Sequence, residues 1–396
     1  MIAVTPHERE EAERLCALVD AERLGRTALE YLAIPSPTCN ELAFAEFLAE
    51  QLRRMSLEVE VTRLYPNSPN VIARQRYALP GRTLELDAHL DTINMPHAAP
   101  EIRAGRLHGR GACDMKGALA CMVEAARVLS QTRLPLAGSL LITAHAMHEA
   151  PHGHSEPLDD MIARGQFGDA CIIAEIGSTR LPMAGLGMSI FDITVERSGE
   201  PLHETKGRGV PNPIALASRI LSALTARSDE LARNPDEWRD SLFVGQVHAG
   251  DFYNRIPTRC HIQGTRRYGP PADVDDMRAE FAQLLAFTRA PELQGLNTRV
   301  ELTRIADGFQ VSPDEEIVGC LKEAYQQVHG EALGEERCTV VGNAAWFIRD
   351  AGVPCLYHGL DPSSAHADHE SADLHAMVQL TQTYIRTALL YLRPTA

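Results

Sequence analysis

Several apolar runs of this chain end in a histidine or a carboxylate, and this pattern constrains the fold more than any other feature. The run "TLELDAHLDT" ends in His89 and Asp91, "GSLLITAHAMHEA" leads into His148 and Glu149, and "DACIIAEIG" carries Glu175 near its end. Short apolar runs rich in β-branched residues indicate buried strands. Because open α/β sheets bind ligands at the carboxyl ends of their strands, these residues predict a site along one rim of a sheet.

Residues 148–152, His-Glu-Ala-Pro-His, match the H-E-x-x-H pattern of zinc-protease helices, but we interpret the match as accidental. Pro151 lies between the two histidines, where it removes a backbone donor and clashes with the preceding turn of a helix. A strand that runs out into a loop is therefore predicted here. The other histidines of this segment are expected to be solvated, with a place in the pocket as the alternative: His145, His152 and His154.

Two further segments carry candidate ligands. Asp114 in "GRGACDMKGALACMVEAARVL" precedes a predicted helix whose apolar positions recur at helical spacing, and the glycines of "GRGACDMKG" have no obvious packing purpose. His366 in "GVPCLYHGLDPSSAHADHESADLH" lies on a loop between a predicted strand and a helix from about Ser371. If the loops converge, two histidines and three carboxylates form a nitrogen–oxygen donor set that suits zinc, or manganese or cobalt. The set is His89, Asp114, Glu149, Glu175 and His366.

Composition narrows the class of protein. A chain of 396 residues is long enough for two domains, or for one domain with an insertion. Its formal net charge of −15 argues against nucleic acids and anionic membranes as partners. No apolar stretch approaches the roughly 18 residues of a membrane span, and the charged N-terminal segment does not resemble a signal peptide. The nine cysteines form no C-x-x-C pair, so we expect reduced thiols and a cytoplasmic location.

The motifs resemble those of the metal-dependent aminoacylase and carboxypeptidase family, which includes acetylornithine deacetylase, succinyl-diaminopimelate desuccinylase, aminoacylase and glutamate carboxypeptidase. The shared motifs, in order, are "HLDT", "GRGACDMKG", the run into Glu149, "AEIG", "NRIP" and "SSAHADHES", which span nearly the whole chain. The resemblance implies one or two divalent ions, with Asp114 bridging them. It places His89 and Glu175 on one ion, and Glu149 and His366 on the other.

The resemblance also implies a role for Asp91 and for the ions. Asp91 would accept a hydrogen bond from the ligating histidine and fix its tautomer. Two ions that share a water molecule would lower its pKa and polarise the carbonyl group that is cleaved.

The family resemblance implies an α/β catalytic domain, with a mixed sheet and helices on both faces, that is interrupted by a smaller α+β lid. The lid commonly forms the interface of a homodimer. We expect catalytic segments at 1–183 and 306–396 and the lid at 184–305. Alternating apolar residues in "LGMSIFDITVERSG" and "TRCHIQGTRRY" indicate strands, and "PIALASRILSALTA" and "DVDDMRAEFAQLLAF" indicate helices, which predicts an antiparallel sheet with two helices.

Three motifs of the predicted lid have counterparts in the family. His203 in "EPLHET" matches a histidine that can reach the reacting carbonyl oxygen, sometimes from the partner subunit, where a donor would stabilise developing negative charge. Asn254 in "FYNRIP" matches an asparagine that contacts substrate. Arg266 or Arg267 in "GTRRYG" falls near an arginine that binds substrate carboxylates, a group that a guanidinium pairs with well.

The chain departs from the family at the general base. The family has two adjacent glutamates where this chain has His148 and Glu149, and the first glutamate is the base. His148 could take that role, because imidazole titrates near neutral pH. Alternatively, Glu149 is the base and one ion is held tightly, or the chain binds a ligand without hydrolysing it. A second departure, Asn343-Ala344 in place of threonine or serine and aspartate, predicts a changed substrate pocket.

We therefore expect a metal-dependent hydrolase that cleaves the amide C–N bond of a small N-acyl amino acid or similar carboxylate. One alternative is an unusual C–N bond such as that of an aromatic amine, as in the aminohydrolase of nitro-substituted anthranilate. Another is a catalytically inactive relative that binds a metal or a ligand. A small-molecule substrate and a second copy of the chain are the expected partners, with neither nucleic acid nor membrane.

Overall fold

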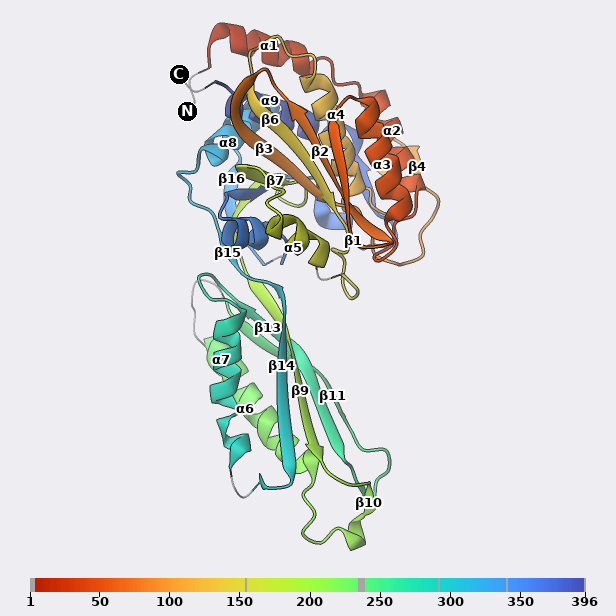
Figure 1. Ribbon diagram of the computed structural model, residues 1–396, viewed down its shortest axis with the longest axis vertical. Helices are drawn as coiled ribbons and strands as arrows, with labels where there is room; N and C mark the ends of the chain where they lie inside the picture. The colour runs from red at the N-terminus through yellow and green to blue at the C-terminus, as the bar shows by residue number, and fades with distance from the viewer. Residues whose placement is uncertain (1–3, 154, 234–238, 291–292, 340, 395–396) are drawn as a thin grey trace. The chain divides into compact units, whose positions relative to one another are not determined.

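The computed structural model describes residues 4–153, 155–233, 239–290, 293–339 and 341–394 (Figure 1). The chain forms two compact units. The first unit contains residues 1–183, 311–337 and 346–396, and the second contains 184–310 and 338–345. Residues 338–345 join the second unit, whereas the sequence predicted 306–396 as one catalytic segment. His154 lies outside the described residues.

A six-stranded mixed sheet forms the centre of the first unit, in the order β1-β2-β6-β3-β7-β17. Four neighbouring strands are parallel to one another: β6, β3, β7 and β17. At one side of the sheet, β2 is antiparallel to β6, and β1 is antiparallel to β2. The two central strands are almost completely buried along their carboxyl-terminal halves, which explains their continuous apolar runs. The strands are β1 (Glu58–Tyr65), β2 (Ser68–Arg76), β3 (Leu79–His89), β6 (Ala137–His145), β7 (Ala170–Ile173) and β17 (Cys355–Tyr357).

Helices cover both faces of this sheet. Figure 1 shows α4 and α9 behind the sheet and α5 in front of it. α4 is buried almost throughout, since it packs against the sheet, α2 and α9. The helices of this unit are α1 (Pro6–Cys16), α2 (Ala21–Ala33), α3 (Leu42–Arg54), α4 (Lys116–Leu129), α5 (Glu156–Ala163), α8 (Glu316–His329) and α9 (Leu374–Tyr391), with a π-helical turn at Trp346–Ala351.

The first unit also contains a small three-stranded sheet in the order β18-β5-β4. Its strands are β4 (Glu101–Arg103), β5 (Arg106–His108) and β18 (Ser371–Asp373). The sequence placed a helix start near Ser371, but Ser371 pairs with His108 in β18. Helix α9 begins at Leu374 instead, because the Asp373 side chain caps it by accepting the backbone N–H groups of His375 and Ala376.

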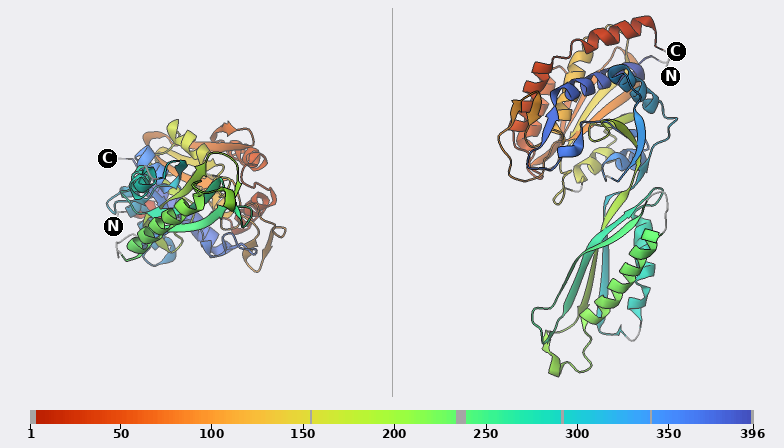
Figure 2. Two further views of the ribbon diagram at one scale, coloured as in Figure 1. Left: turned by 90° about the horizontal axis from the view of Figure 1, so that it is seen from below. Right: turned by 180° about the vertical axis from the view of Figure 1, so that it is seen from behind.

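The second unit is a four-stranded antiparallel sheet, in the order β11-β13-β9-β14, with two helices against one face (Figure 2, right). Alternate residues of β9 and β13 pack with α6 and α7 in one apolar core. The principal elements are β9 (Gly187–Arg197), α6 (Pro213–Arg233), β11 (Ser241–Ala249), β13 (Arg259–Tyr268), α7 (Val274–Leu284) and β14 (Leu296–Ala306). The predicted antiparallel sheet with two helices is present.

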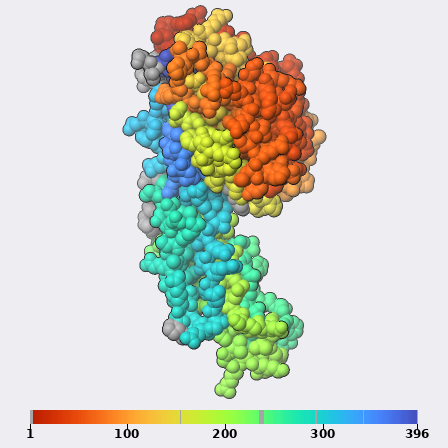
Figure 3. Space-filling view, in the orientation of Figure 1, coloured from red at the N-terminus to blue at the C-terminus, as the bar shows by residue number. Residues whose placement is uncertain are grey.

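The remaining short elements include two strands that pair at one end of the second unit, β10 (Leu202–His203) and β12 (Arg255–Ile256). The segments through which the chain passes from one unit to the other contain β8 (Arg180–Gly185), β15 (Phe309–Gln310) and β16 (Gly334–Cys338). In Figure 3, α7 and β14 lie side by side on the visible surface of the second unit. A groove of about 660 Å³ is lined by residues of both elements, and β14 is an edge strand of the sheet among the described residues.

The observed architecture confirms the predicted fold class, a mixed-sheet α/β unit together with a smaller α+β unit. No helix among the described residues has the length and apolar character needed to cross a bilayer.

Candidate metal centre

Four parallel strands bring the predicted ligands to one rim of the mixed sheet. β3 ends at His89 itself, and the chain reaches Glu149 shortly after β6 and Glu175 shortly after β7. His366 follows β17 on a longer loop, and Asp114 lies just before α4. Because parallel strands end at the same edge of a sheet, residues far apart in sequence meet there.

The geometry shows a close cluster around Asp114. Its Oδ1 lies 3.0 Å from Nε2 of His89, and its Oδ2 lies 3.1 Å from Nε2 of His366. Nε2 of His366 is also 3.1 Å from Oε1 of Glu149. One ligand atom from each of His89, Asp114 and Glu149 lies within 4.8 Å of the other two. Asp114 therefore turns one carboxylate oxygen to each histidine, as a bridging ligand would.

The cluster has the chemistry of a divalent-cation site. Oε2 of Glu175 is buried and has no hydrogen-bond partner among the described residues. Burial, followed by the negative charge of Asp114, raises the pKa of Glu175 to about 8. Within the described chain, no lysine or arginine forms an ion pair with Asp114, Glu149 or Glu175. Crowded carboxylates with imidazole nitrogens and no local cation fit zinc, manganese or cobalt.

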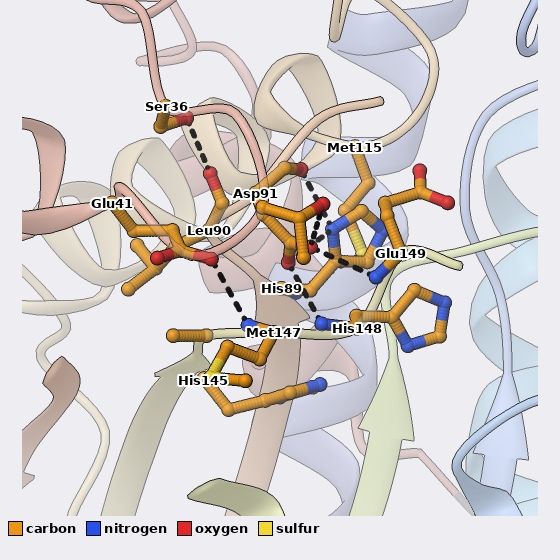
Figure 4. A network of polar contacts seen from close by, with 12 residues as sticks. Ser36, Glu41, His89, Leu90, Asp91, Met115, His145, Met147, His148 and Glu149 are labelled. Atoms are coloured by element: carbon orange, nitrogen blue, oxygen red, sulfur yellow. Dashed lines mark hydrogen bonds and ion pairs between the residues drawn. The ribbon is translucent and has the colours of Figure 1, made fainter. Parts of the chain in front are cut away.

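Asp91 holds the loop that carries two of the site residues (Figure 4). Its Oδ1 accepts the backbone N–H of His148 at 3.1 Å, and its Oδ2 accepts that of Glu149 at 2.8 Å. Nδ1 of His89 lies 2.9 Å from the backbone carbonyl oxygen of Asp91, but 3.6 Å from its Oδ1. Both acceptors of Asp91 therefore face Nδ1 of His89, and the carbonyl oxygen is the nearer of the two.

Glu41 is a buried residue of this network that the sequence analysis missed (Figure 4). Its Oε1 accepts the backbone N–H of Met147 at 3.1 Å and that of Cys39 at 2.9 Å, and its Oε2 accepts the hydroxyl of Ser68 at 2.6 Å. Glu41 immediately precedes α3, where an acidic residue looks like an ordinary helix-start residue. The sequence offers no local signal that would distinguish its actual role.

The histidines at the end of β6 and in the loop after it differ in burial and in their contacts. The segment is a strand followed by a loop, so the H-E-x-x-H match is not a zincin helix. His145 was expected to be solvated, but it is fully buried at the end of β6, with Nδ1 3.3 Å from Oδ1 of Asp87. His152 is exposed. The ring of His148 stacks on that of His89 at a centroid distance of 4.3 Å.

Two residues of the motif around Asp114, Gly117 and Lys116, have structural roles. A Cβ on Gly117 would lie 2.0 Å from the backbone oxygen of Ala112, so only glycine fits there. The Lys116 ammonium is buried and donates to the carbonyl oxygens of Tyr31 at 3.2 Å and Ile34 at 2.6 Å. Burial lowers the pKa of Lys116 to about 7. The interpretation that the glycines serve no packing purpose is wrong at Gly117.

Two predicted residues of the second unit lie together. The pairing of β10 with β12 places the amide nitrogen of Asn254 3.1 Å from Nε2 of His203. Arg266 is buried, with Nη1 3.0 Å from Oδ2 of Asp240 and Nε 2.9 Å from Oε2 of Glu280. Arg267 is less buried, and its Nη1 donates to the Thr339 carbonyl oxygen at 3.1 Å. Asn343 and Ala344 are buried.

Comparison with known proteins assigns the chain to a family. The profile of Peptidase family M20/M25/M40 matches residues 86–390. The chain belongs to this family. A succinyl-diaminopimelate desuccinylase from Xanthomonas oryzae pv. oryzae (strain MAFF 311018) is 31% identical to it over 314 residues, which cover 74% of this chain and 77% of the relative. The desuccinylase of Xylella fastidiosa (strain 9a5c) is 27% identical, covering 91% of this chain and 97% of its own.

Solved structures share the M20 fold. Aminopeptidase PepT from Bacillus cereus superposes with a TM-score of 0.75 at 18% identity, covering 94% of this chain and 99% of that chain. The M20 metallo-carboxypeptidase Sso-CP2 from Sulfolobus solfataricus has a TM-score of 0.75 at 17% identity, covering 92% and 98%. The predicted family and enzyme class are confirmed: this M20 chain is a metallo-hydrolase that acts on carbon–nitrogen bonds.

Proposed function

We propose that the chain hydrolyses the amide bond of a small N-acyl amino acid or similar carboxylate at the rim of its mixed sheet. The observation that carries the proposal is the placement of the Asp114 oxygens 3.0 Å and 3.1 Å from the Nε2 atoms of His89 and His366. The similarity to desuccinylases, whose name denotes removal of an acyl group, supports an N-acyl substrate.

His89, Asp114, Glu149, Glu175 and His366 are proposed to hold two divalent ions, with Asp114 between them. A solved neighbour from Bacillus subtilis with a TM-score of 0.69 is described as a dinuclear metal-binding peptidase of family M20, which supports the number of ions. When bound, such ions supply Lewis-acid polarisation of the carbonyl and lower the pKa of a water molecule. Zinc, manganese and cobalt all suit this donor set.

The chain's own residues would position the reactants and move the proton. His148 stands where the family has its general base, and its imidazole is proposed to take the proton from the attacking water and return it to the leaving amine. Asp91 fixes this residue by accepting its backbone N–H at 3.1 Å. If His148 serves another purpose, the neighbouring carboxylate of Glu149 is the alternative proton acceptor.

The second unit, residues 184–310 and 338–345, is proposed to be the lid and dimerisation domain, which the sequence predicted at 184–305. His203 would donate a hydrogen bond to the carbonyl oxygen as negative charge develops there. Asn254, which contacts His203, and Arg267 would bind the substrate. The unpaired edges of the sheet, β11 and β14, are surfaces suited to pairing with a second copy of the chain. Analytical ultracentrifugation of the full chain tests the proposed homodimer.

A panel of substrates tests the proposed function. The purified chain is assayed with N-succinyl and N-acetyl amino acids, dipeptides and aromatic amines, before and after chelation and after zinc, manganese or cobalt is restored. We expect metal-dependent cleavage of N-acyl amino acids. Cleavage of aromatic amines alone would instead favour the alternative of an aminohydrolase, for which the substitution of histidine at position 148 is the supporting observation. Cleavage that survives complete removal of metal would contradict the proposal.

All nine cysteines lie among the described residues and form no disulfide there. A cytoplasmic location stays a prediction.

A further inference from the structure

We infer that Glu370 is a positioning residue that joins the loop carrying Asp114 to the loop carrying His366. The inference rests on the proposed metal centre, because both loops supply its ligands. Glu370 is only 3% exposed, and it lies between His366 and strand β18. It therefore belongs to the His366 loop, while all its side-chain partners belong to the other loop.

The carboxylate of Glu370 accepts hydrogen bonds from four residues of the segment between Arg110 and Asp114. Oε1 accepts the backbone N–H of Cys113 at 3.0 Å and that of Asp114 at 3.1 Å. Oε2 accepts the backbone N–H of Gly111 at 2.9 Å and Nη1 of Arg110 at 3.2 Å. Both oxygens are thus used, and the charge of the buried carboxylate is offset by a buried guanidinium.

The main chain strengthens the same link. The Glu370 carbonyl oxygen accepts the backbone N–H of Gly109 at 3.0 Å. Ser371, the next residue, pairs with His108 where β18 meets β5. Glu370 is therefore held at its backbone and its side chain by one continuous segment that ends at Asp114.

His366 depends on this anchor because its own loop has little regular structure. The loop is closed by Ser364 and Ser371, whose side-chain oxygen and backbone nitrogen lie 3.1 Å apart. His366 lies inside this short closure in a left-handed backbone conformation with φ of 62°, and its side chain is 53% exposed. Few packing contacts hold the side chain of His366 in such a loop. The position of its Nε2 relative to Asp114 is therefore set by Glu370 and Ser371, which are hydrogen-bonded to the Asp114 segment.

The predicted consequence concerns metal affinity. Glu370 is not among the proposed ligands, so we expect it to act by holding Asp114 and His366 at the separation that a shared ion needs. Groups that orient ligands in this way typically change metal affinity by about 10- to 100-fold when they are removed. We expect the ion bound by Glu149 and His366 to be weakened most.

The test compares Glu370→Gln with a matched variant, Glu11→Gln. Glu11 is also a buried glutamate, which accepts the Arg133 backbone N–H at 2.7 Å and Nε of Arg14 at 2.7 Å, but it lies at α1. For each protein we would measure the zinc dissociation constants by competition with a chelator, the thermal stability of the metal-free form, and amide hydrogen exchange of residues 109–114.

Glu370→Gln is expected to weaken zinc binding by about 10- to 100-fold and to speed hydrogen exchange at Gly111, Cys113 and Asp114. Glu11→Gln is expected to leave both unchanged. Saturating zinc should restore the kcat of Glu370→Gln.

If Glu370→Gln does not fold, Glu370→Asp keeps the charge beside Arg110 but shortens the reach to the backbone donors, and the same loss of affinity is expected. Wild-type affinity in the folded variant, or an equal loss in Glu11→Gln, would overturn the inference. Failure of the wild type to bind zinc, manganese or cobalt would instead remove the proposed metal centre.

Discussion

The imidazole ring of His148 lies almost parallel to that of His89, with centroids 4.3 Å apart and planes inclined by 10°. Burial, followed by the charge of His89, lowers the pKa of His148 to about 4. The ring next to the proposed metal ligand is therefore a neutral imidazole at neutral pH, the protonation state that a general base needs before it takes a proton. The neutral state of His148 is therefore consistent with its proposed role as the general base.

His148→Ala is expected to lower kcat by about 10²- to 10⁴-fold, the usual contribution of a general base. Metal content should stay at the wild-type value, since His148 is not among the proposed ligands. Steady-state kinetics on the best N-acyl amino acid, together with elemental analysis, measures both. His152→Ala removes an exposed histidine of the same loop and should behave like the wild type. Normal turnover by His148→Ala would transfer the proton-accepting role to Glu149.

The two adjacent arginines of β13 are expected to respond differently to substitution. Arg266→Ala leaves the carboxylates of Asp240 and Glu280 without their buried partner, and we expect a loss of about 3 to 5 kcal/mol in the stability of the second unit. Arg267→Ala should instead raise KM by about 10-fold or more, as expected for a lost charged hydrogen bond to the substrate. Denaturant unfolding and steady-state kinetics of both variants separate the effects. An unchanged KM in Arg267→Ala would remove it from the substrate site.

Gly117→Ala should prevent the Asp114 loop from closing. The added Cβ would lie 2.0 Å from the Ala112 oxygen, a backbone atom that cannot rotate away. We expect a cost of about 3 kcal/mol or more in the free energy of unfolding. Gly245→Ala is the control, because its Cβ would meet its nearest neighbour at 3.5 Å, and it should change stability by no more than about 0.5 kcal/mol. Equal stability of the two variants in urea would show that the Ala112 contact does not constrain the loop.

His358 is expected to make the fold sensitive to acid. Its Nδ1 donates to the Gly177 carbonyl oxygen at 2.9 Å, and burial lowers its pKa to about 4. An unfolded histidine titrates near pH 6.5, so between these values the unfolded chain binds more protons. Stability from this group is complete above about pH 6.5 and falls by about 3 kcal/mol as the pH drops to about 4.

His358→Asn keeps a donor for Gly177 but removes the titration. With metal chelated from both proteins, the free energy of unfolding of the wild type should fall more steeply between pH 6.5 and 4 than that of His358→Asn. Parallel pH profiles would show that the His358 ring does not contribute to acid sensitivity.

The convergence of the candidate ligands could be predicted because several of them lie at or just after strand ends. His89, Glu149 and Glu175 follow apolar runs that become parallel neighbours in the sheet, so strand order alone brings them together. Asp114 and His366 lie on loops, where no periodic pattern of apolar residues marks their position. The prediction that they join the site therefore depended on the resemblance of their motifs to those of the family. The antiparallel sheet of the second unit followed from alternation of apolar residues in β9 and β13.

The supporting residues could not be predicted, since their partners are backbone groups of distant loops. Glu41 and Glu370 each accept backbone N–H groups from segments far along the chain. No side-chain pattern encodes such a contact. His145 was misjudged for a similar reason: its burial depends on its place in a central strand and on the carboxylate of Asp87 in the neighbouring strand.

The central proposal is that Asp114, together with His89, Glu149, Glu175 and His366, would hold two divalent ions. Equilibrium dialysis against zinc or manganese, followed by elemental analysis, tests it most directly. Asp368→Asn, an exposed aspartate in the His366 loop, serves as the control. The account predicts two ions per chain in the wild type and the control, and loss of bound metal in Asp114→Asn. Wild-type metal content and affinity in Asp114→Asn would contradict it.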